Sequence, residues 1–274
     1  MLEVKSLSLS VGGAAILRDV SVTVGDGEFV AVVGPNGAGK SSLLKCVNRV
    51  YRRYGGDILL DSVSTRRMPQ RALARRVAYV PQFAAGAFSG SGFTVRQFVA
   101  QGRYPWRSWR DMWSSDANND GAVDEAINLT GLTGLSDRLL DSLSGGERQK
   151  VMFAAAIAQM PNSSPQQRVA GSPSSILLLD EPTTYLDYRR QVEIAALTRS
   201  MRLNTDTSAL IVTHDLNFAL RSSDRVAVMS EGRVIWNGEP GELVELGMPE
   251  QLFGVKFARF SSGGGLPFIV PEEF

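Results

Sequence analysis

Residues 29–41 read FVAVVGPNGAGKS, five apolar residues followed by a glycine-rich loop, a lysine and a serine. The apolar run Phe29–Val33 predicts a strand that is covered on both faces, as in a parallel sheet. The loop fits the pattern G-x-x-x-x-G-K-[ST] at every specified position, and Leu43–Val50 behind it reads as a helix. Strand, glycine loop and helix in this order predict a phosphate-binding loop.

The residue types of this loop suit a nucleoside triphosphate with its metal ion. Glycines let backbone N–H groups close around phosphate oxygens, and the following helix adds the positive end of its dipole. Lys40 is predicted to reach the β- and γ-phosphates, and the Ser41 hydroxyl to ligate Mg²⁺. The alternative, a glycine-rich turn with an incidental lysine, is disfavoured by the strand and helix around it. The predicted nucleotide-binding residues of the loop are Gly34, Pro35, Asn36, Gly37, Ala38, Gly39, Lys40, Ser41 and Ser42.

A second apolar run, Ile176–Leu179, ends in two acids, Asp180 and Glu181. A buried strand would place Asp180 beside the phosphate loop, where a carboxylate can hold Mg²⁺ directly or through water. Glu181 would face another way, as a base for the water that attacks the γ-phosphate. Two solvated acids at a strand end are the alternative, which the four preceding aliphatic residues and the phosphate loop disfavour.

Two further polar residues follow predicted strands. His214, the single histidine, comes after the apolar run Ala209–Val212 and Thr213, and Gln82 follows the short strand Val77–Val80. A lone histidine is more often structural, but ligands bind at the carboxyl ends of parallel strands. His214 and Gln82 are therefore predicted catalytic residues, with Gln82 also able to contact Mg²⁺ or its water.

Composition describes an ordinary globular chain. Its 274 residues, 43% hydrophobic and 21% charged, suffice for a sizeable core. The net charge of +1 gives no field that favours nucleic acid, although Trp106, Trp109 and Trp113 lie among arginines. Cys46 is the single cysteine, so no internal disulfide is possible. The first residues alternate like a strand, and no apolar run approaches the ~20 residues of a membrane span, so we expect neither export nor membrane insertion.

Strands and helices alternate around one helical block. Residues 2–33 read as two alternating strands and the buried strand, and a further hairpin is expected around Gly55-Gly56. Residues 83–160 read as helical, with Thr94 and Gln97 spaced as a capping box. The polar, serine- and proline-rich stretch 162–175 reads as a surface loop. The sequence therefore predicts an α/β fold with a mostly parallel sheet, an N-terminal antiparallel β subdomain and an inserted α-helical subdomain.

One stretch of the sequence matches part of a calcium-binding loop. Asp116, Asn118, Asp120 and Gly121 match the first half of an EF-hand loop, but the twelfth position is Ile127 instead of a glutamate. We interpret the stretch as a polar loop in which Asp120 caps the next helix.

These motifs, in this order, resemble the nucleotide-binding subunits of ATP-binding cassette (ABC) transporters over roughly residues 1–245. The resemblance implies a P-loop NTPase (RecA-like) core from 1–82 and 161–245, a helical signature subdomain at 83–160 and a C-terminal extension at 246–274. The family motifs fall on Gly34–Ser41 (Walker A), Gln82 (Q-loop), Leu143–Glu147 (signature), Ile176–Asp180 (Walker B), Glu181 (catalytic glutamate), Leu186-Asp187 (D-loop) and His214 (switch histidine).

The family resemblance gives the segment LSGGERQK, residues 143–150, a role in a homodimer. In such proteins the signature of one subunit completes the ATP site begun by the phosphate loop of the other. The Ser144 side chain, the amides of Gly145 and Gly146 and the helix N-terminus behind them suit a γ-phosphate. Glu147 and Asp187 are further residues expected at this shared site, which takes ATP and Mg²⁺.

A closer resemblance is to importers of iron-siderophores, haem and cobalamin. It rests on the segments QGRYP (101–105), TTYLD (183–187), HDLN (214–217) and GLPFIVP (265–271). It implies a peripheral subunit on the cytoplasmic face of the cell membrane, which binds a permease and acts indirectly with an extracytoplasmic substrate-binding protein. Two features depart from the family: Val11 stands where an aromatic usually stacks on adenine, and 162–175 is a longer link than usual.

The sequence also leaves other classes of nucleotide-binding protein open. The ATPase of an exporter has the same catalytic core, and co-purification with a permease and a binding protein would distinguish the two. A soluble ABC ATPase of translation or DNA repair usually has two cassettes or a long coiled coil, and the sequence has neither. A monomeric P-loop kinase or GTPase is disfavoured by the signature segment.

Overall fold

The computed structural model describes residues 1–82, 90–107, 117–161, 175–204, 207–260 and 268–272. They form two compact units. Unit 1 comprises Met1–Arg67, Leu178–Glu181 and Ser208–Phe274, and unit 2 comprises Met68–Leu177 and Pro182–Thr207.

The first sheet of unit 1 is antiparallel and has the order β2-β1-β4-β5. Residues Leu2, Val4, Leu7 and Leu9 alternate with more exposed positions and are buried, which confirms the predicted pattern of a half-buried strand. The strands are β1 (Leu2–Val11), β2 (Ala14–Val24), β4 (Gly55–Leu60) and β5 (Val63–Ser64).

The hairpin expected around Gly55-Gly56 is wrong in position. These glycines begin β4, and the β4–β5 turn lies at Asp61 and Ser62, whose φ angles are 48° and 64°. A Cβ on Gly56 would lie 2.3 Å from the carbonyl oxygens of Lys5 and Ser6. The glycine serves a close approach to β1, a role that the dipeptide pattern cannot distinguish from a turn.

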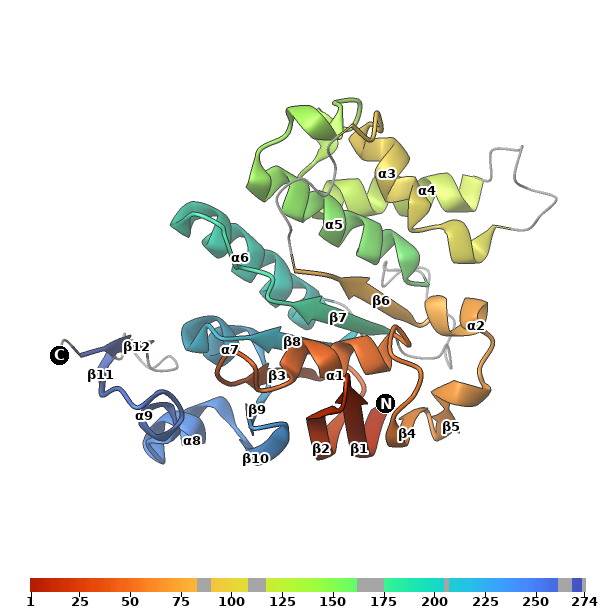
Figure 1. Cartoon of the computed structure of the whole chain (residues 1–274). Helices are drawn as coiled ribbons and strands as arrows, with labels where there is room; N and C mark the ends of the chain where they lie inside the picture. The colour runs from red at the N-terminus through yellow and green to blue at the C-terminus, as the bar shows by residue number, and fades with distance from the viewer. Residues whose placement is uncertain (83–89, 108–116, 162–174, 205–206, 261–267, 273–274) are drawn as a thin grey trace. The chain divides into compact units, whose positions relative to one another are not determined.

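The second sheet places the phosphate loop. All five residues of β3 (Phe29–Val33) are buried, and β3 pairs in parallel with β8 (Ser208–Thr213) and β9 (Arg225–Ser230). The end of β7 (Ile176–Asp180) follows β8 in the sheet, and β10 (Arg233–Gly238) pairs antiparallel with β9. Figure 1 shows β3, β8 and α1 (Lys40–Val47) close together in this unit. The predicted mostly parallel α/β sheet is confirmed.

The remaining elements of unit 1 follow β8. Helix α7 (Leu216–Ser222) contacts β3 and β8, and the two-stranded sheet of β11 (Phe257–Phe260) and β12 (Phe268–Pro271) contacts α7 through β12. The short helices α8 (Pro240–Glu245) and α9 (Met248–Phe253) lie between β10 and β11 along the chain.

Unit 2 is mainly helical. Helices α3 (Val95–Gln101) and α4 (Ala117–Leu129) pack on α5 (Gly145–Gln159), and α5 contacts β6 (Val77–Val80). The predicted capping box is confirmed, since Gln97 N donates to Thr94 Oγ1 and Thr94 N donates to Gln97 Oε1. The unit also holds α2 (Gln70–Ala74), the start of β7 and α6 (Tyr188–Asn204), and short 3₁₀ turns occur in the chain at Thr65–Arg67, Tyr104–Trp106, Thr133–Leu135 and Leu140–Ser142.

The predicted helix cap at Asp120 is wrong. Helix α4 begins at Ala117, so Asp120 lies within its first turn and does not precede it as a cap. A carboxylate there still faces the positive end of the helix dipole. The loop predicted at 162–175 lies outside the described residues except for Ser175.

Candidate active site

The phosphate loop joins β3 to α1 in unit 1. Its first and last specified glycines allow close approaches: a Cβ on Gly34 would lie 2.0 Å from the Met229 carbonyl oxygen, and one on Gly39 would lie 2.9 Å from the Ile16 carbonyl oxygen. Gly39 also has a φ of 96°, which favours glycine. Among the described residues, no side chain caps the N-terminus of α1, and its first turn holds no acidic residue. The amides there are available to an anion.

Lys40, at the start of α1, points back over the loop. Its Nζ donates to the carbonyl oxygens of Gly34, at 2.7 Å, and Pro35, at 3.0 Å, and lies 4.0 Å from Glu181 Oε1. The side chain is 6% exposed, and burial lowers its pKa against the opposing charges of Glu181 and Asp180. A cation held by neutral carbonyls can exchange them for phosphate oxygens at the same loop.

Ser41 and Asp180 bring two oxygen ligands together. The Ser41 hydroxyl donates to Asp180 Oδ1 at 2.8 Å, and Asp180 is 2% exposed at the end of β7. Hydroxyl and carboxylate oxygens are ligands that Mg²⁺ prefers. The donor set therefore fits the predicted metal ion, which the Ser41 hydroxyl and the Asp180 carboxylate would help to hold.

Glu181 and His214 form the third part of the site. His214 Nδ1 lies 2.7 Å from Glu181 Oε2, and the His214 backbone N–H donates to the same oxygen at 3.3 Å. Glu181 is 7% exposed and has a φ of 49°, an uncommon conformation for a non-glycine residue. Its backbone N–H donates to the Val212 carbonyl on β8 at 2.8 Å, which helps to hold it there. Such strain often marks a functional residue.

The pair shifts both pKa values. Burial alone would raise the pKa of Glu181, but the His214 hydrogen bond, its charge and Lys40 together lower it below its ordinary 4.5. The hydrogen bond to Glu181 raises the pKa of His214 above 6.5. Glu181 is therefore ionised at neutral pH, as a general base must be.

These shifts predict a pH window for stability. The raised histidine pKa stabilises the fold fully below pH 6.5, and this effect is lost as pH rises through the raised value. The lowered carboxyl pKa stabilises it above pH 4.5, and this effect is lost as pH falls through the lowered value. The free energy of unfolding that His214→Ala removes should be largest between these values, as urea denaturation across pH would measure. An effect that does not depend on pH would contradict the charge pairing.

Gln82 and Val11 lie in different units. Gln82 follows β6 in unit 2 and is exposed, while Val11 ends β1 in unit 1 and is 42% exposed. The structure thus joins Lys40, Ser41, Asp180, Glu181 and His214 within unit 1, and the contribution of Gln82 stays a prediction.

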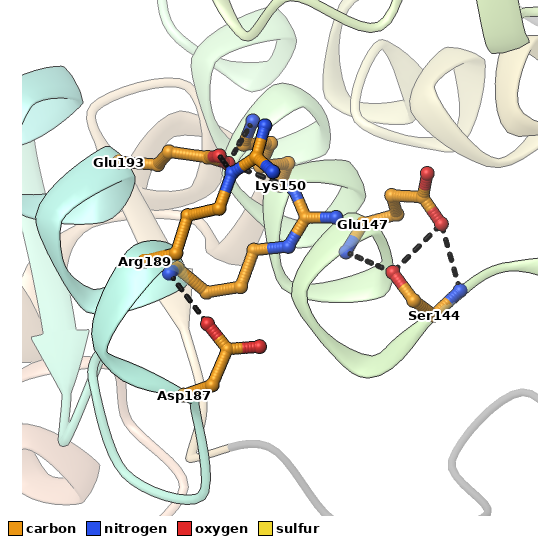
Figure 2. Close-up of polar contacts among 7 residues, drawn as sticks. Ser144, Glu147, Lys150, Asp187, Arg189 and Glu193 are labelled. Carbon is orange, nitrogen blue, oxygen red and sulfur yellow. Dashed lines mark hydrogen bonds and ion pairs between the residues drawn. The ribbon is translucent and has the colours of Figure 1, made fainter.

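The signature segment begins α5 in unit 2. Figure 2 shows its Ser144 and Glu147 in a capping box. Ser144 N and Oγ donate to Glu147 Oε2 at 2.8 and 2.7 Å, and Glu147 N donates to Ser144 Oγ at 3.4 Å. These bonds lower the pKa of Glu147. In the part of the chain that the structure describes, no atom lies within 4 Å of the place where a Gly145 Cβ would be.

Helix α6 supports the other signature glycine, a feature that the sequence analysis missed. A Cβ on Gly146 would lie 2.6 Å from the Cγ and Cδ atoms of Arg190. The Glu193 carboxylate forms ion pairs with Lys150 at 2.6 Å and Arg189 at 3.3 Å (Figure 2). It also pairs with Arg190 at 2.8 Å, and these contacts lower the pKa of Glu193 to about 2. Asp187 of the D-loop accepts from the Arg190 backbone N–H at 2.9 Å. The sequence signal for the Glu193 ion pairs is the spacing within α6, since Arg190 and Arg189 lie three and four positions before Glu193.

The capping boxes at Ser144 and Thr94, which both use a hydroxyl, allow a matched prediction. Ser144→Ala and Thr94→Ala each remove an N-cap hydroxyl, so each should lower the free energy of unfolding by about 1 kcal/mol. Only Ser144→Ala should also weaken ATP-dependent dimerisation, because only Ser144 belongs to the signature. Thermal denaturation and light scattering with ATP measure the two effects. Equal dimerisation by both variants would contradict the signature role.

Comparison with known proteins identifies the family. A family model described as "ABC transporter" matches residues 17–164. "Probable siderophore transport system ATP-binding protein YusV" of Bacillus subtilis (strain 168) is 35% identical over 251 residues, which cover 92% of this chain and 85% of that protein. The chain belongs to the ABC transporter family. "Hemin import ATP-binding protein HmuV" of Rhodopseudomonas palustris (strain BisB18) is 32% identical over 271 residues, with coverage of 99% and 94%.

A solved structure supports the fold. The dimeric structure of a bacterial ABC transporter cassette superposes with a TM-score of 0.69 at 22% identity, covering 88% of this chain and 99% of the cassette. The predicted resemblance is confirmed: the chain is an ATP-binding ABC ATPase of the importer type. Among its described helices, none is long and apolar enough to cross a membrane.

Proposed function

We propose that this chain hydrolyses ATP to drive uptake of an iron-siderophore, haem, cobalamin or a related metal chelate through a membrane permease. The observation that carries the ATPase part is the single connected set of Lys40, Ser41, Asp180, Glu181 and His214 in unit 1. The names of the siderophore and haemin relatives support the class of ligand.

The phosphate loop binds and orients the triphosphate. Backbone N–H groups of residues 34–42, apart from Pro35, which has none, surround the phosphate oxygens. Lys40 leaves the Gly34 and Pro35 carbonyls to bind the β- and γ-phosphates. Ser41 and Asp180, with Gln82, would hold Mg²⁺, which supplies positive charge to the phosphates when bound. The same residues thus fix the γ-phosphate for attack.

Glu181 acts as the general base. It accepts a proton from water as the water oxygen bonds to the γ-phosphorus, and the bond to the β-phosphate oxygen breaks with its electron pair leaving on ADP. His214 holds the Glu181 carboxylate in place through the 2.7 Å contact and stabilises its charge. The products are ADP and inorganic phosphate.

Two copies of the chain form a homodimer across ATP. Ser144, the amides of Gly145 and Gly146 and the start of α5 bind the γ-phosphate held by the phosphate loop of the partner, and Glu147 and Asp187 support this surface. Hydrolysis removes the shared γ-phosphate, so the dimer opens. The cycle of closure and opening drives the permease.

The subunit works at the cytoplasmic face of the cell membrane. Gln82 and the apolar segment Phe83–Phe88, which lies outside the described residues, contact the permease. An extracytoplasmic substrate-binding protein delivers the ligand to the permease, so it acts on this chain only indirectly. Val11 leaves adenine without the usual aromatic partner.

Reconstitution tests the proposal. The chain is co-purified with the permease encoded beside it and placed in vesicles, with ATP on the side of the ATPase. We expect ATP-dependent uptake of a ferric siderophore, haemin or cobalamin, each tested separately, and none with Glu181→Gln. Transport in the opposite direction, or ATP hydrolysis unaffected by every permease tested, would contradict the importer role.

A further inference from the structure

Asn217 on α7 is joined to the C-terminal strand β12 by two hydrogen bonds. Its Nδ2 donates to the Ile269 carbonyl at 2.8 Å, and the Ile269 N–H donates to its Oδ1 at 2.9 Å. The side-chain amide therefore satisfies both backbone groups of Ile269, as a neighbouring strand would. Ile269 is 2% exposed. The partners are 52 positions apart in the sequence, so this is a tertiary contact that local structure does not require.

Helix α7 begins directly behind the candidate base. Asp215 caps the helix, since Phe218 N donates to Asp215 Oδ1 at 3.0 Å, and Asp215 N donates to Thr213 Oγ1 at 3.0 Å. His214, between Thr213 and Asp215, bonds to Glu181 through its ring and its backbone N–H. A movement of the first turn of α7 would therefore move both contacts of His214 with Glu181.

The helix is too short to fix its own position. It has seven residues, and helices of this length depend on packing for their stability. It contacts β3, β8, α8 and β12. Arg221, one turn beyond Asn217, adds a cation–π contact to Phe268 at 5.1 Å. The C-terminal strand thus contacts α7 at Asn217 and Arg221, two of its less buried residues, through polar and aromatic contacts.

We propose that Asn217 is a positioning residue, through which the C-terminal strand β12 holds α7 and thereby keeps His214 against Glu181. The proposal rests on the proposed role of His214 and extends it. It also gives a role to two stretches that the catalytic motifs leave unused. They are the end of HDLN (214–217), after its catalytic histidine, and GLPFIVP (265–271), and Asn217 of the first bonds to Ile269 of the second. The C-terminal extension is then part of the machinery for hydrolysis.

Steady-state kinetics of Asn217→Ala is the first test. Small displacements of a catalytic group cost up to ~100-fold in rate, so we expect kcat to fall by about 10-fold. The KM for ATP should change by less than about 2-fold, because the phosphate loop is untouched. Asn237→Ala, the same change at an exposed residue of β10, is the matched control and should behave like the parent. Asn217→Asp, which retains an acceptor for the Ile269 N–H, should lie between the two.

The single histidine allows a direct readout that a loss of stability alone would not produce. One imidazole signal in a proton NMR titration reports His214. The charged groups that act on it are Glu181, Lys40 and Asp215, and they remain in Asn217→Ala. If the hydrogen bonds between Asn217 and Ile269 keep the imidazole ring on Glu181, the titration midpoint of His214 in Asn217→Ala should shift down toward 6.5. The midpoint in Asn237→Ala should not shift.

A double-mutant cycle tests the route. Ile269→Pro removes the N–H that Asn217 accepts, so its effect on kcat and that of Asn217→Ala should not add. An unchanged kcat and titration midpoint in folded Asn217→Ala would overturn the proposal, as would additive effects of the two changes. His214→Ala separates this failure from failure of the proposed function. If His214→Ala hydrolyses ATP slowly but Asn217→Ala has a normal kcat, the positioning role of Asn217 is wrong. If His214→Ala hydrolyses ATP normally, the proposed role of the histidine is wrong.

Discussion

Glu181→Gln should bind ATP but hydrolyse it about 10²- to 10⁴-fold more slowly, the usual contribution of a general base. Glutamine keeps the size of the side chain and can still contact His214 Nδ1, but it cannot accept the proton from water. ATP should therefore persist and hold the two copies together. Single-turnover hydrolysis and size-exclusion chromatography with MgATP measure the two results.

Glu193→Gln is the matched control for this change. Glu193 also carries a lowered pKa and ion pairs, but it supports α5 and α6 in unit 2 and lies outside the connected set of unit 1. We expect its variant to hydrolyse ATP without trapping a stable dimer. A monomeric Glu181→Gln with normal turnover would contradict the assignment of the base.

Lys40→Ala should lose about 100-fold or more in ATP affinity and most turnover. Each charge-assisted hydrogen bond contributes about 1.5–3 kcal/mol, and two contacts with phosphates replace the present contacts with Gly34 and Pro35. Isothermal titration calorimetry measures the affinity. Glu181 loses the positive charge of Lys40 in this variant but keeps its contacts with His214 at 2.7 and 3.3 Å, so we expect the variant to fold.

Lys256→Ala provides the control for a lost positive charge, since this lysine is exposed between α9 and β11. It should bind ATP like the parent. If Lys40→Ala binds ATP as tightly as the parent, the assignment of Lys40 to the phosphate site is wrong, whatever the behaviour of the control.

The sequence predicted the fold where one local pattern sufficed. Phe29–Val33 is apolar throughout and became the central strand, and the spacing of Thr94 and Gln97 became a capping box. Prediction failed at Gly55-Gly56, because a glycine pair is compatible with both a turn and a close approach between strands. Only the carbonyl oxygens of β1 beside Gly56 distinguish them.

The residues of the candidate site were predictable where they lie at strand ends, but the tertiary contacts that support them were not. Asp180, Glu181 and His214 each follow an apolar strand, so their neighbourhood follows from parallel pairing. The support of Gly146 by Arg190, and the bonds of Asn217 with Ile269, depend on tertiary contacts between distant segments. No periodicity in a single sequence reports such contacts.

Mixing Lys40→Ala chains with Ser144→Arg chains measures most directly whether two copies share each ATP site. A mixed dimer would pair the intact phosphate loop of one copy with the intact signature of the other. In a random mixture, half the dimers are mixed and each has one intact site of two, so about a quarter of the parent's ATP-binding sites should return. ATP binding that never exceeds that of the separate variants would contradict the shared site.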